Sequence, residues 1–321
     1  MTGAAFDSQV GYAVESPSGT FTAPTRAIEH VKSSLNSVRP PIISKGMKAG
    51  RRTGFRSYKG AEVVKGTITH ELAPVAVGML FKQGVGAVAT SGAGPFTDIY
   101  TPGPLVETQT LSVQVGTPDD AGTVNPLNFI GCQIPSFAVN VKTGEVVMID
   151  IDFVGQHLQN TGDGDTVAGL TAATYNAAWA PFTWANAALT LNGAAFEFDD
   201  LTIKIDNGLR TDHYTTRATN PSRPKISKES DQRLFTCQLN SDLWDITAMN
   251  RAFAGTEVAF SLALTSGASS LTFAGAVRTD PFSPTIDGPG NLKQALNLTF
   301  VSATSDAAAL TITQVTTDTL P

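Results

Sequence analysis

Apolar and polar residues alternate with a period of two through much of this chain. The alternation is clearest where Asp150 and Asp152 are interleaved with valine, isoleucine and phenylalanine, and where Lys204 and Asp206 follow isoleucine. This period is that of a β-strand with one face in a core and the other in water. We therefore predict a mainly β protein. Its predicted strands include Val63–Thr69, Thr110–Val115, Phe129–Ile134, Ser136–Val141, Val146–Val154, Leu201–Ile205, Arg233–Leu239, Val258–Leu264 and Leu296–Val301.

Two segments, Val63–Val88 and Leu234–Val258, have the same order of features. Each begins with an alternating strand, continues with an acidic residue followed by leucine, and passes into a short apolar stretch closed by glycine. The stretch predicts one helix in each segment, over Glu71–Lys82 in the first and after an N-cap at Ser241 in the second. Such a repeat predicts two copies of one β domain that contains a single helix.

The repeat sets the expected domain boundaries. We expect a first domain at residues 1–158, a small and polar linker at 159–183, a second domain at 184–308, and a C-terminal tail at 309–321 that could add a strand. The first domain contains, near residues 39–60, a basic stretch without periodicity. A stretch of this length in a compact domain predicts an extended arm or loop with a function.

Charge separates this arm from the rest of the chain. Of the 321 residues only 16% are charged, and the net charge is −6. The stretch from Arg26 to Lys65 has ten Lys/Arg and two Glu, so it carries 10 − 2 = +8 and the remainder carries −6 − 8 = −14. A basic arm on an acidic body favours self-association. Binding of the arm to nucleic acid is a weaker alternative, because few aromatic residues are interleaved with its basic ones.

The sequence contains no pattern of a catalytic, cofactor or metal site. None of the four histidines has metal-ligand spacing to another histidine or to a cysteine, and no phosphate-binding loop or dinucleotide fingerprint occurs. The adjacent acidic pairs, Asp150 with Asp152 and Asp199 with Asp200, are expected on solvated strand faces. Cys132 and Cys237 each lie in an apolar strand and are predicted to be buried free thiols. We therefore predict a protein that is not an enzyme and needs no cofactor.

Membrane insertion and secretion are also not predicted. No run of about 18 apolar residues occurs. The N-terminus lacks the basic start and apolar core of a signal peptide.

Three motifs of this chain resemble those of a known protein family. The opening G-Y-A-V-E-S-P-S-G-T-F-T-A-P-T-R at Gly11–Arg26 is similar to the start of bacteriophage tail tube proteins. The block G-x-I-x-x-E-L at Gly66–Leu72 and the segment W-x-x-A-x-L-T-L-N-G at Trp184–Gly193 are similar to later family blocks. Each motif is loose, but their order and spacing extend the resemblance over nearly the whole chain.

The resemblance implies two tandem tail-tube-like β-sandwich or barrel domains, each with one flanking α-helix. Family subunits join edge to edge into rings, and the rings stack into a tube around a channel. The tape measure protein occupies the channel during assembly, and double-stranded DNA passes through it transiently during ejection. Tail terminator and distal tail proteins bind the two ends. The implied location is the virion tail, assembled in the bacterial host cytoplasm.

A duplicated chain changes the expected number of subunits in a ring. Because the best-known rings hold six single-domain subunits, three of these chains would supply six domains, and six chains are the alternative. We expect the wet strand faces with Asp150, Asp152, Lys204 and Asp206 to line the channel. The arm is expected to contact the next ring, although a merely solvated loop is the alternative; its candidate contact residues are Arg51, Arg52, Arg56 and Lys59.

Two other functions fit the same sequence. A tail terminator or baseplate hub protein could contain the same domain without forming long tubes. A secreted carbohydrate-binding β-sandwich protein could have a similarly bland surface, although the missing signal peptide and the basic arm argue against it.

Overall fold

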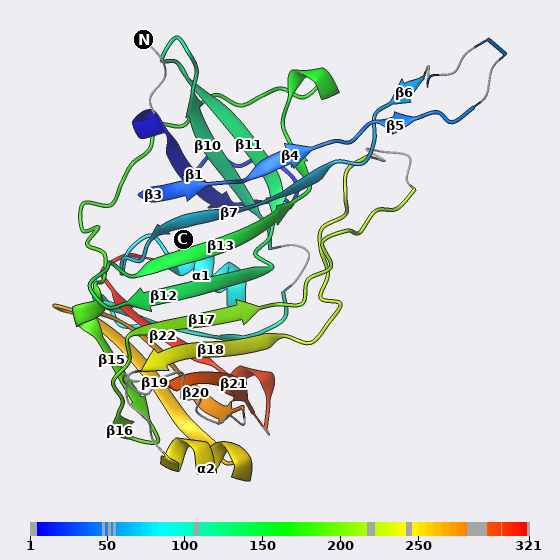
Figure 1. Ribbon diagram of the computed structural model, residues 1–321. Helices are drawn as coiled ribbons and strands as arrows, with labels where there is room; N and C mark the ends of the chain where they lie inside the picture. Colours follow the sequence, from blue (N-terminus) through cyan, green and yellow to red (C-terminus); the bar gives the residue numbers. More distant parts are fainter. Residues whose placement is uncertain are drawn as a thin grey trace, which may run out of the picture.

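The computed structural model describes residues 5–46, 49–50, 53, 56–105, 109–216, 222–241, 246–280, 294–302 and 304–319. Strands make up 49% of the residues and helices 10%, so the protein is mainly β, as the alternation predicts. The strands are antiparallel and form one small sheet, one large sheet and a short hairpin (Figure 1).

The small sheet has the strand order β14–β11–β10–β1–β2. Its strands are β1 (Gln9–Val14), β2 (Arg26–Ile28), β10 (Leu111–Pro118), β11 (Val124–Cys132) and β14 (His157–Leu158). The segment that follows β14 is held against this sheet by buried amides: Gln114 Nε2 donates to the Gly169 carbonyl at 3.1 Å and Asn128 Nδ2 donates to that of Ala168 at 2.8 Å. The predicted linker is therefore packed on the sheet along this part of its length.

The large sheet has 15 strands, and its longest run is β16–β15–β19–β20–β21–β18–β17–β12–β13–β7–β3. The strands of this run are β3 (His30–Ser33), β7 (Val63–Glu71), β12 (Ser136–Lys142), β13 (Met148–Gly155), β15 (Ala187–Leu191), β16 (Ala194–Ala195), β17 (Asp200–Asp206), β18 (Leu234–Ser241), β19 (Glu257–Ser266), β20 (Ser269–Thr279) and β21 (Gln294–Val301). The other members are β4 (Asn36–Val38), β8 (Gly86–Ser91), β9 (Phe96–Pro102) and β22 (Thr311–Thr316).

The large sheet forks at β20. Residues 270–274 of β20 pair with β22, and residues 276–279 of the same strand pair with β21. One branch continues through β22, β9 and β8, and the other through β21, β18, β17 and β12. The two branches diverge from one strand and enclose a core between them.

Helix α1 (Gly78–Val85) fills the space between the branches. The ring of Phe81 lies 5.7 Å from that of Tyr100 on β9, 5.7 Å from that of Phe137 on β12 and 6.3 Å from that of Phe273 on β20. Gly84 also lies against the ring of Phe137, because a Cβ at this position would be only 2.8 Å from Cε1 of that ring. The helix therefore approaches β12 as closely as a residue without a side chain allows.

The predicted start of this helix, at Glu71, is wrong. Strand β7 continues through Glu71, which pairs with Met148, and the N–H of Leu72 donates to the Val147 carbonyl at 2.8 Å. The acidic residue and the leucine that follows it, Glu71 and Leu72, therefore lie at the end of a strand and do not begin the helix. The chain then turns at Ala76, whose φ is 62°, and the helix begins at Gly78.

The second helix, α2 (Ile246–Ala254), is packed differently. Ala252 is the only residue of the helix that is buried, and the side chains of Ile246 and Phe253 are exposed. Residues 242–245, which include part of the predicted helix start, lie outside the described residues.

Strand pairing in the two halves of the chain follows one pattern. Strand β7 lies between β13 and β3, β18 lies between β21 and β17, and a helix follows each of β7 and β18. The halves are joined because β12 pairs with β17 over seven residue pairs, from Ser136↔Asp206 to Lys142↔Asp200. Strand β22, near the C-terminus, pairs with β20 of one half and β9 of the other. The boundaries at 158, 183 and 308 remain predictions.

Both predicted free cysteines are confirmed. Cys132 on β11 and Cys237 on β18 are buried and unpaired with each other. Burial raises the pKa of both thiols, which keeps them in the protonated form at neutral pH.

Truncation of Phe81 tests whether α1 stabilises the core between the two branches of the large sheet. Phe81→Ala should lower the free energy of unfolding by about 3–5 kcal/mol, because a large buried ring is lost and a cavity remains. Denaturant titration measures this change. Phe253→Ala on α2 is the matched control, and it should change the value by less than about 0.5 kcal/mol because its ring is 63% exposed. Equal effects of the two substitutions would contradict the central role of α1.

Candidate functional site

The four residues predicted on wet strand faces lie on one face of the large sheet. Asp150 is opposite Ala138, and Ala138 is opposite Lys204 on the next strand. Asp152 and Asp206 lie on the same face, two residues further along their strands. The alternating residues of β13 and β17, such as Ile149 and Ile203, are buried on the core side.

The two aspartates of β13 are built into this face by hydrogen bonds. Each carboxylate accepts from the strands on both of its sides, β7 and β12. The donors are Thr69 and Asn140 for Asp150, with Asn140 at 2.9 Å, and Thr67 and Ser136 for Asp152, both at 2.5 Å. Because these bonds cross the sheet, the carboxylates also fix the relative positions of three strands.

Acidic side chains outnumber basic ones on this face. On β7, β13, β12 and β17 the strand register puts five acids and three lysines on the polar side: Glu71, Asp150, Asp152, Asp200, Asp206, Lys65, Lys142 and Lys204. The face is therefore polar across four adjacent strands and has a small excess of negative charge.

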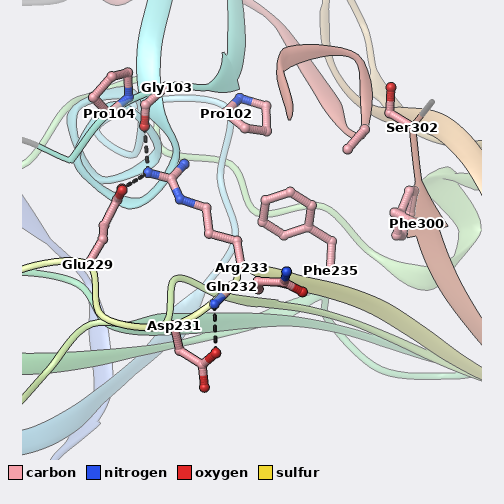
Figure 2. Close-up of a pocket in the computed structure, with 11 residues that line it drawn as sticks. Pro102, Gly103, Pro104, Glu229, Asp231, Gln232, Arg233, Phe235, Phe300 and Ser302 are labelled. Carbon is pink, nitrogen blue, oxygen red and sulfur yellow. Dashed lines mark hydrogen bonds and ion pairs between the residues drawn. The ribbon is translucent and has the colours of Figure 1, made fainter. Parts of the chain in front are cut away.

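A cavity of about 650 Å³ lies at the end of the sheet where β18 begins (Figure 2). Phe235 and Phe300 contribute apolar surface, and Arg233 crosses the cavity wall toward Gly103 and Glu229. Arg233 donates to the Val85 carbonyl at 3.0 Å and the Gly103 carbonyl at 2.5 Å. Because Val85 is the last residue of α1, Arg233 caps the C-terminus of that helix. The positive charge of Arg233 therefore stabilises the end of α1.

The basic stretch forms an arm, which extends away from the body at the upper right of Figure 1. Its hairpin pairs β5 (Ile42–Ile43) with β6 (Ser57–Tyr58), and the Ser44 N–H donates to the Arg56 carbonyl at 2.9 Å. Of the predicted contact residues, Arg56 and Lys59 are on the exposed hairpin. Arg51 and Arg52 lie outside the described residues.

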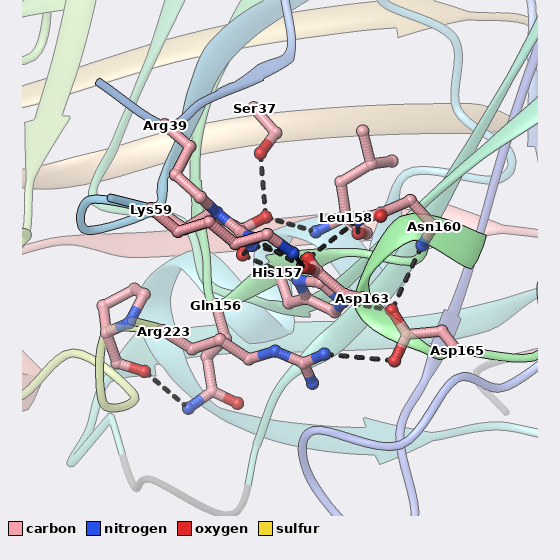
Figure 3. A network of polar contacts seen from close by, with 12 residues as sticks. Ser37, Arg39, Lys59, Gln156, His157, Leu158, Asn160, Asp163, Asp165 and Arg223 are labelled. Carbon is pink, nitrogen blue, oxygen red and sulfur yellow. Dashed lines mark hydrogen bonds and ion pairs between the residues drawn. The ribbon is translucent and has the colours of Figure 1, made fainter. Parts of the chain in front are cut away.

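A network of charged side chains holds the base of the arm (Figure 3). Arg39 forms ion pairs with Glu62 and with Asp163, the latter at 2.7 Å, and Lys59 pairs with Asp163 at 2.9 Å. Nδ1 of His157 lies 2.7 Å from Oε2 of Glu62. The network therefore joins the two ends of the arm to β14 and to the segment after it.

The network extends to Asp165 and Arg223. Nε2 of His157 lies 2.5 Å from Oδ2 of Asp165, and Arg223 pairs with the other oxygen of Asp165 at 3.0 Å. Arg223 belongs to the irregular segment between β17 and β18. Two long irregular segments are thus tied to the same buried histidine.

The pKa values of the carboxyl groups reflect this pairing. Burial alone would raise the pKa of Glu62, but hydrogen bonds from His157, the Leu158 N–H and Ser37 outweigh it and lower the pKa to about 2. The hydrogen bond from Arg39, together with that from Lys59, lowers the pKa of Asp163. All the carboxylates are thereby held in their charged form.

These residues do not fit a metal site. Ligand atoms of Glu62, His157 and Asp163 lie within 4.8 Å of one another, a spacing that could hold an ion. The guanidinium of Arg39 contacts both carboxylates, and the ammonium of Lys59 contacts Asp163. The chain therefore supplies the positive charge that a metal would bring.

Sequence reasoning missed the network and the cavity. Glu62 and His157 are 95 positions apart, and single histidines and acids at such a distance form no motif. The only available signal was the proximity of Asp163 and Asp165 to His157, which we interpreted as part of a linker.

The fold, the polar face and the projecting arm define a mainly β protein with two related halves. The family model for phage tail tube proteins matches residues 5–313. The chain therefore belongs to the phage tail tube protein family, whose members are structural components of the tail, and the predicted resemblance is confirmed. A search of curated proteins finds no match. None of the described helices is long and apolar enough to cross a membrane.

Acid should loosen the base of the arm. The folded-state pKa of Glu62 is about 2 against 4.5 for the free group, so its charge stabilises the fold above pH 4.5. This contribution, up to about 3 kcal/mol, should be lost as pH falls from about 4.5 to 2.

The measurement is unfolding by denaturant at several pH values. Glu62→Gln should be less stable than the wild type at pH 7, and its stability should fall less between pH 4.5 and 2. The exposed Glu29→Gln provides the control, which should follow the wild-type curve. If Glu62→Gln followed the wild-type curve at every pH, the network would not stabilise the fold.

Proposed function

We propose that this chain is the subunit that polymerises into the tail tube. Rings of three chains stack, and the polar face of the large sheet lines the channel. The observation that carries the proposal is the width of that sheet, whose polar side is continuous from β7 through β13 and β12 to β17.

Edge strands support ring formation. The long run of the sheet ends at β16 on one side and at β3 on the other. An exposed edge presents unpaired N–H and C=O groups that another chain can pair with. Pairing of the β3 edge of one chain with a strand of the next would join the sheets of several chains into one barrel and remove that edge.

The internal repeat supports three chains rather than six. The order β20–β21–β18–β17 in one half corresponds to β12–β13–β7–β3 in the other, and the two sets lie side by side in one sheet. We infer that each chain contributes two equivalent sectors. Three chains then give a ring with six sectors, and the duplicated domains at 1–158 and 184–308 are the units.

Charge on the channel wall suits passage of DNA. A channel that conducts DNA must not bind its phosphates, and affinity for phosphates rises with the number of Lys and Arg contacts. Asp150, Asp152 and Asp206 offset Lys204 on the proposed wall. In this proposal the tape measure protein fills the channel before DNA does, terminator and distal tail proteins bind the tube ends, and the tube acts in the virion after assembly in the host cytoplasm.

Electron microscopy of the purified protein tests the assembly. We expect hollow tubes, with three-fold symmetry and six similar lobes in end-on views. Twelve lobes would indicate that a ring contains six chains and not three. A uniform monomer or a single ring that never stacks would contradict the proposed function and favour the terminator or hub alternative.

Charge reversal on the wall tests its role. Tubes of Asp150→Lys/Asp152→Lys should bind short duplex DNA at least about tenfold more tightly than wild-type tubes at low salt, and the gain should disappear as salt rises. Binding is measured by co-sedimentation of labelled DNA, and DNA delivery by complementation of a phage that lacks the protein.

The matched control is Asp150→Asn/Asp152→Asn, in which each amide oxygen can still accept at the position of one of the two carboxylate oxygens that bind the neighbouring strands. It should form tubes and should bind DNA far less than the lysine variant. Unchanged DNA binding and delivery by the lysine variant, with tubes intact, would show that these residues do not line the channel.

A further inference from the structure

The arm is an apolar and basic projection at one end of the large sheet. The side chains of Ile42, Ile43 and Tyr58 are all more than half exposed, which is unusual for three large apolar residues on a short hairpin. No acidic residue occurs between Arg39 and Gly60. Such a surface fits a partner that offers both an apolar groove and negative charge.

The opposite end of the same sheet offers such a groove, of about 350 Å³. We name it the end groove; it is lined chiefly by Val141, Thr143, Trp184, Leu189, Phe196 and Phe198. The indole of Trp184 is 47% exposed and forms part of the wall. An exposed tryptophan beside phenylalanines is the kind of surface on which binding energy concentrates.

Antiparallel register places the arm and the end groove at opposite ends. The arm leads into β7, whose first residues pair with Val154 and Gly155 at the end of β13. The end groove surrounds the other end of the neighbouring strands, where the Thr143 N–H donates to the Asp199 carbonyl at 2.9 Å. The full length of β12 and β17 therefore separates the two features. In Figure 1, the β5–β6 hairpin and β15, whose residues line the end groove, lie on opposite sides of the molecule.

Negative charge surrounds the end groove. Glu197 lines it, Asp199 and Glu145 lie on the adjoining bends, and Asp200 begins β17 beside them. Lys142 is the nearby cation, and it pairs with Glu145 at 2.5 Å. Four acids against one lysine leave the rim acidic, opposite in sign to the arm.

We propose that the end groove of one chain receives the β5–β6 hairpin of a second copy in the next ring. Ile42, Ile43 and Tyr58 pack against Trp184 and its apolar neighbours, while the basic residues of the arm face the acidic rim. This inference rests on the proposed function and identifies the surface that makes the rings stack. Because donor and acceptor lie on opposite ends, the contact is heterologous and repeats without closing, as a tube requires.

The cavity of Figure 2 is the competing receptor, because Glu229 and Asp231 line it. It lies at the beginning of β18 and the end of β21, which is the end of the sheet that bears the arm. In a head-to-tail stack, that end of the next chain faces away from the incoming arm. The end groove is therefore the receptor that the geometry favours.

Charge exchange tests the proposal. The groove variant, Glu197→Lys/Asp199→Lys, should form rings but at least about tenfold less tube mass than the wild type, because it repels the arm. The arm variant, Lys45→Glu/Arg56→Glu, should fail in the same way. Both pairs of substitutions combined in one chain should restore tubes. Tube mass is measured by sedimentation, and rings are identified by electron microscopy.

The matched control, Asp120→Lys/Asp231→Lys, makes the same charge change away from the end groove and includes an acid of the competing cavity. It should form tubes like the wild type. The milder Glu197→Gln/Asp199→Asn gives an intermediate loss and provides a test should the lysine variant fail to fold, which denaturant titration detects.

The outcomes separate this inference from the proposed function. If the wild type and the groove variant both formed tubes equally well, the end groove would not be the receptor of the arm. The proposed function would not be affected by that result. Loss of tubes in the control but not in the groove variant would assign the arm to the cavity of Figure 2. Absence of wild-type tubes would contradict the proposed function itself.

Discussion

Pairing of β12 with β17 is the interaction on which the rest of the structure depends. Its seven residue pairs join the strands of the two halves into one sheet. Without it, each half would expose one further strand edge, that of β12 in one and that of β17 in the other, whose N–H and C=O groups need partners. The same register aligns Asp150, Ala138 and Lys204 in one row and so makes the polar face continuous. It also sets the distance between the arm and the end groove.

A sheet this wide needs a core on its other side, and the fork at β20 provides it. One strand supplies neighbours to two branches, and α1 occupies the space between them. Arg233, which precedes β18, caps the C-terminus of α1. The helix of one half is therefore completed by a side chain of the other. This sharing explains why the chain has one continuous core even though its strand order repeats.

Sequence patterns predicted the features that depend on local periodicity. Alternation at Asp150 and Asp152 identified both the strand and its polar face, because successive side chains of a strand must point to opposite sides. The same reasoning misplaced the start of α1, since the segment from Leu72 to Val77 is apolar and buried without being helical. No local pattern could reveal the contact of His157 with Glu62, because it depends on how β14 lies beside the start of β7.

The charged network gives the arm a defined direction. Two strands of two residues each cannot hold a hairpin in place by themselves. Arg39 and Lys59, at the two ends of the arm, both bind Asp163, so the network clamps the arm where it leaves the body. Replacing a whole buried network by apolar residues often costs little stability, whereas removing one partner, such as Glu62, leaves the opposite charge uncompensated. The value of the network here lies in geometry: an arm fixed at its base loses less conformational entropy when it binds a partner.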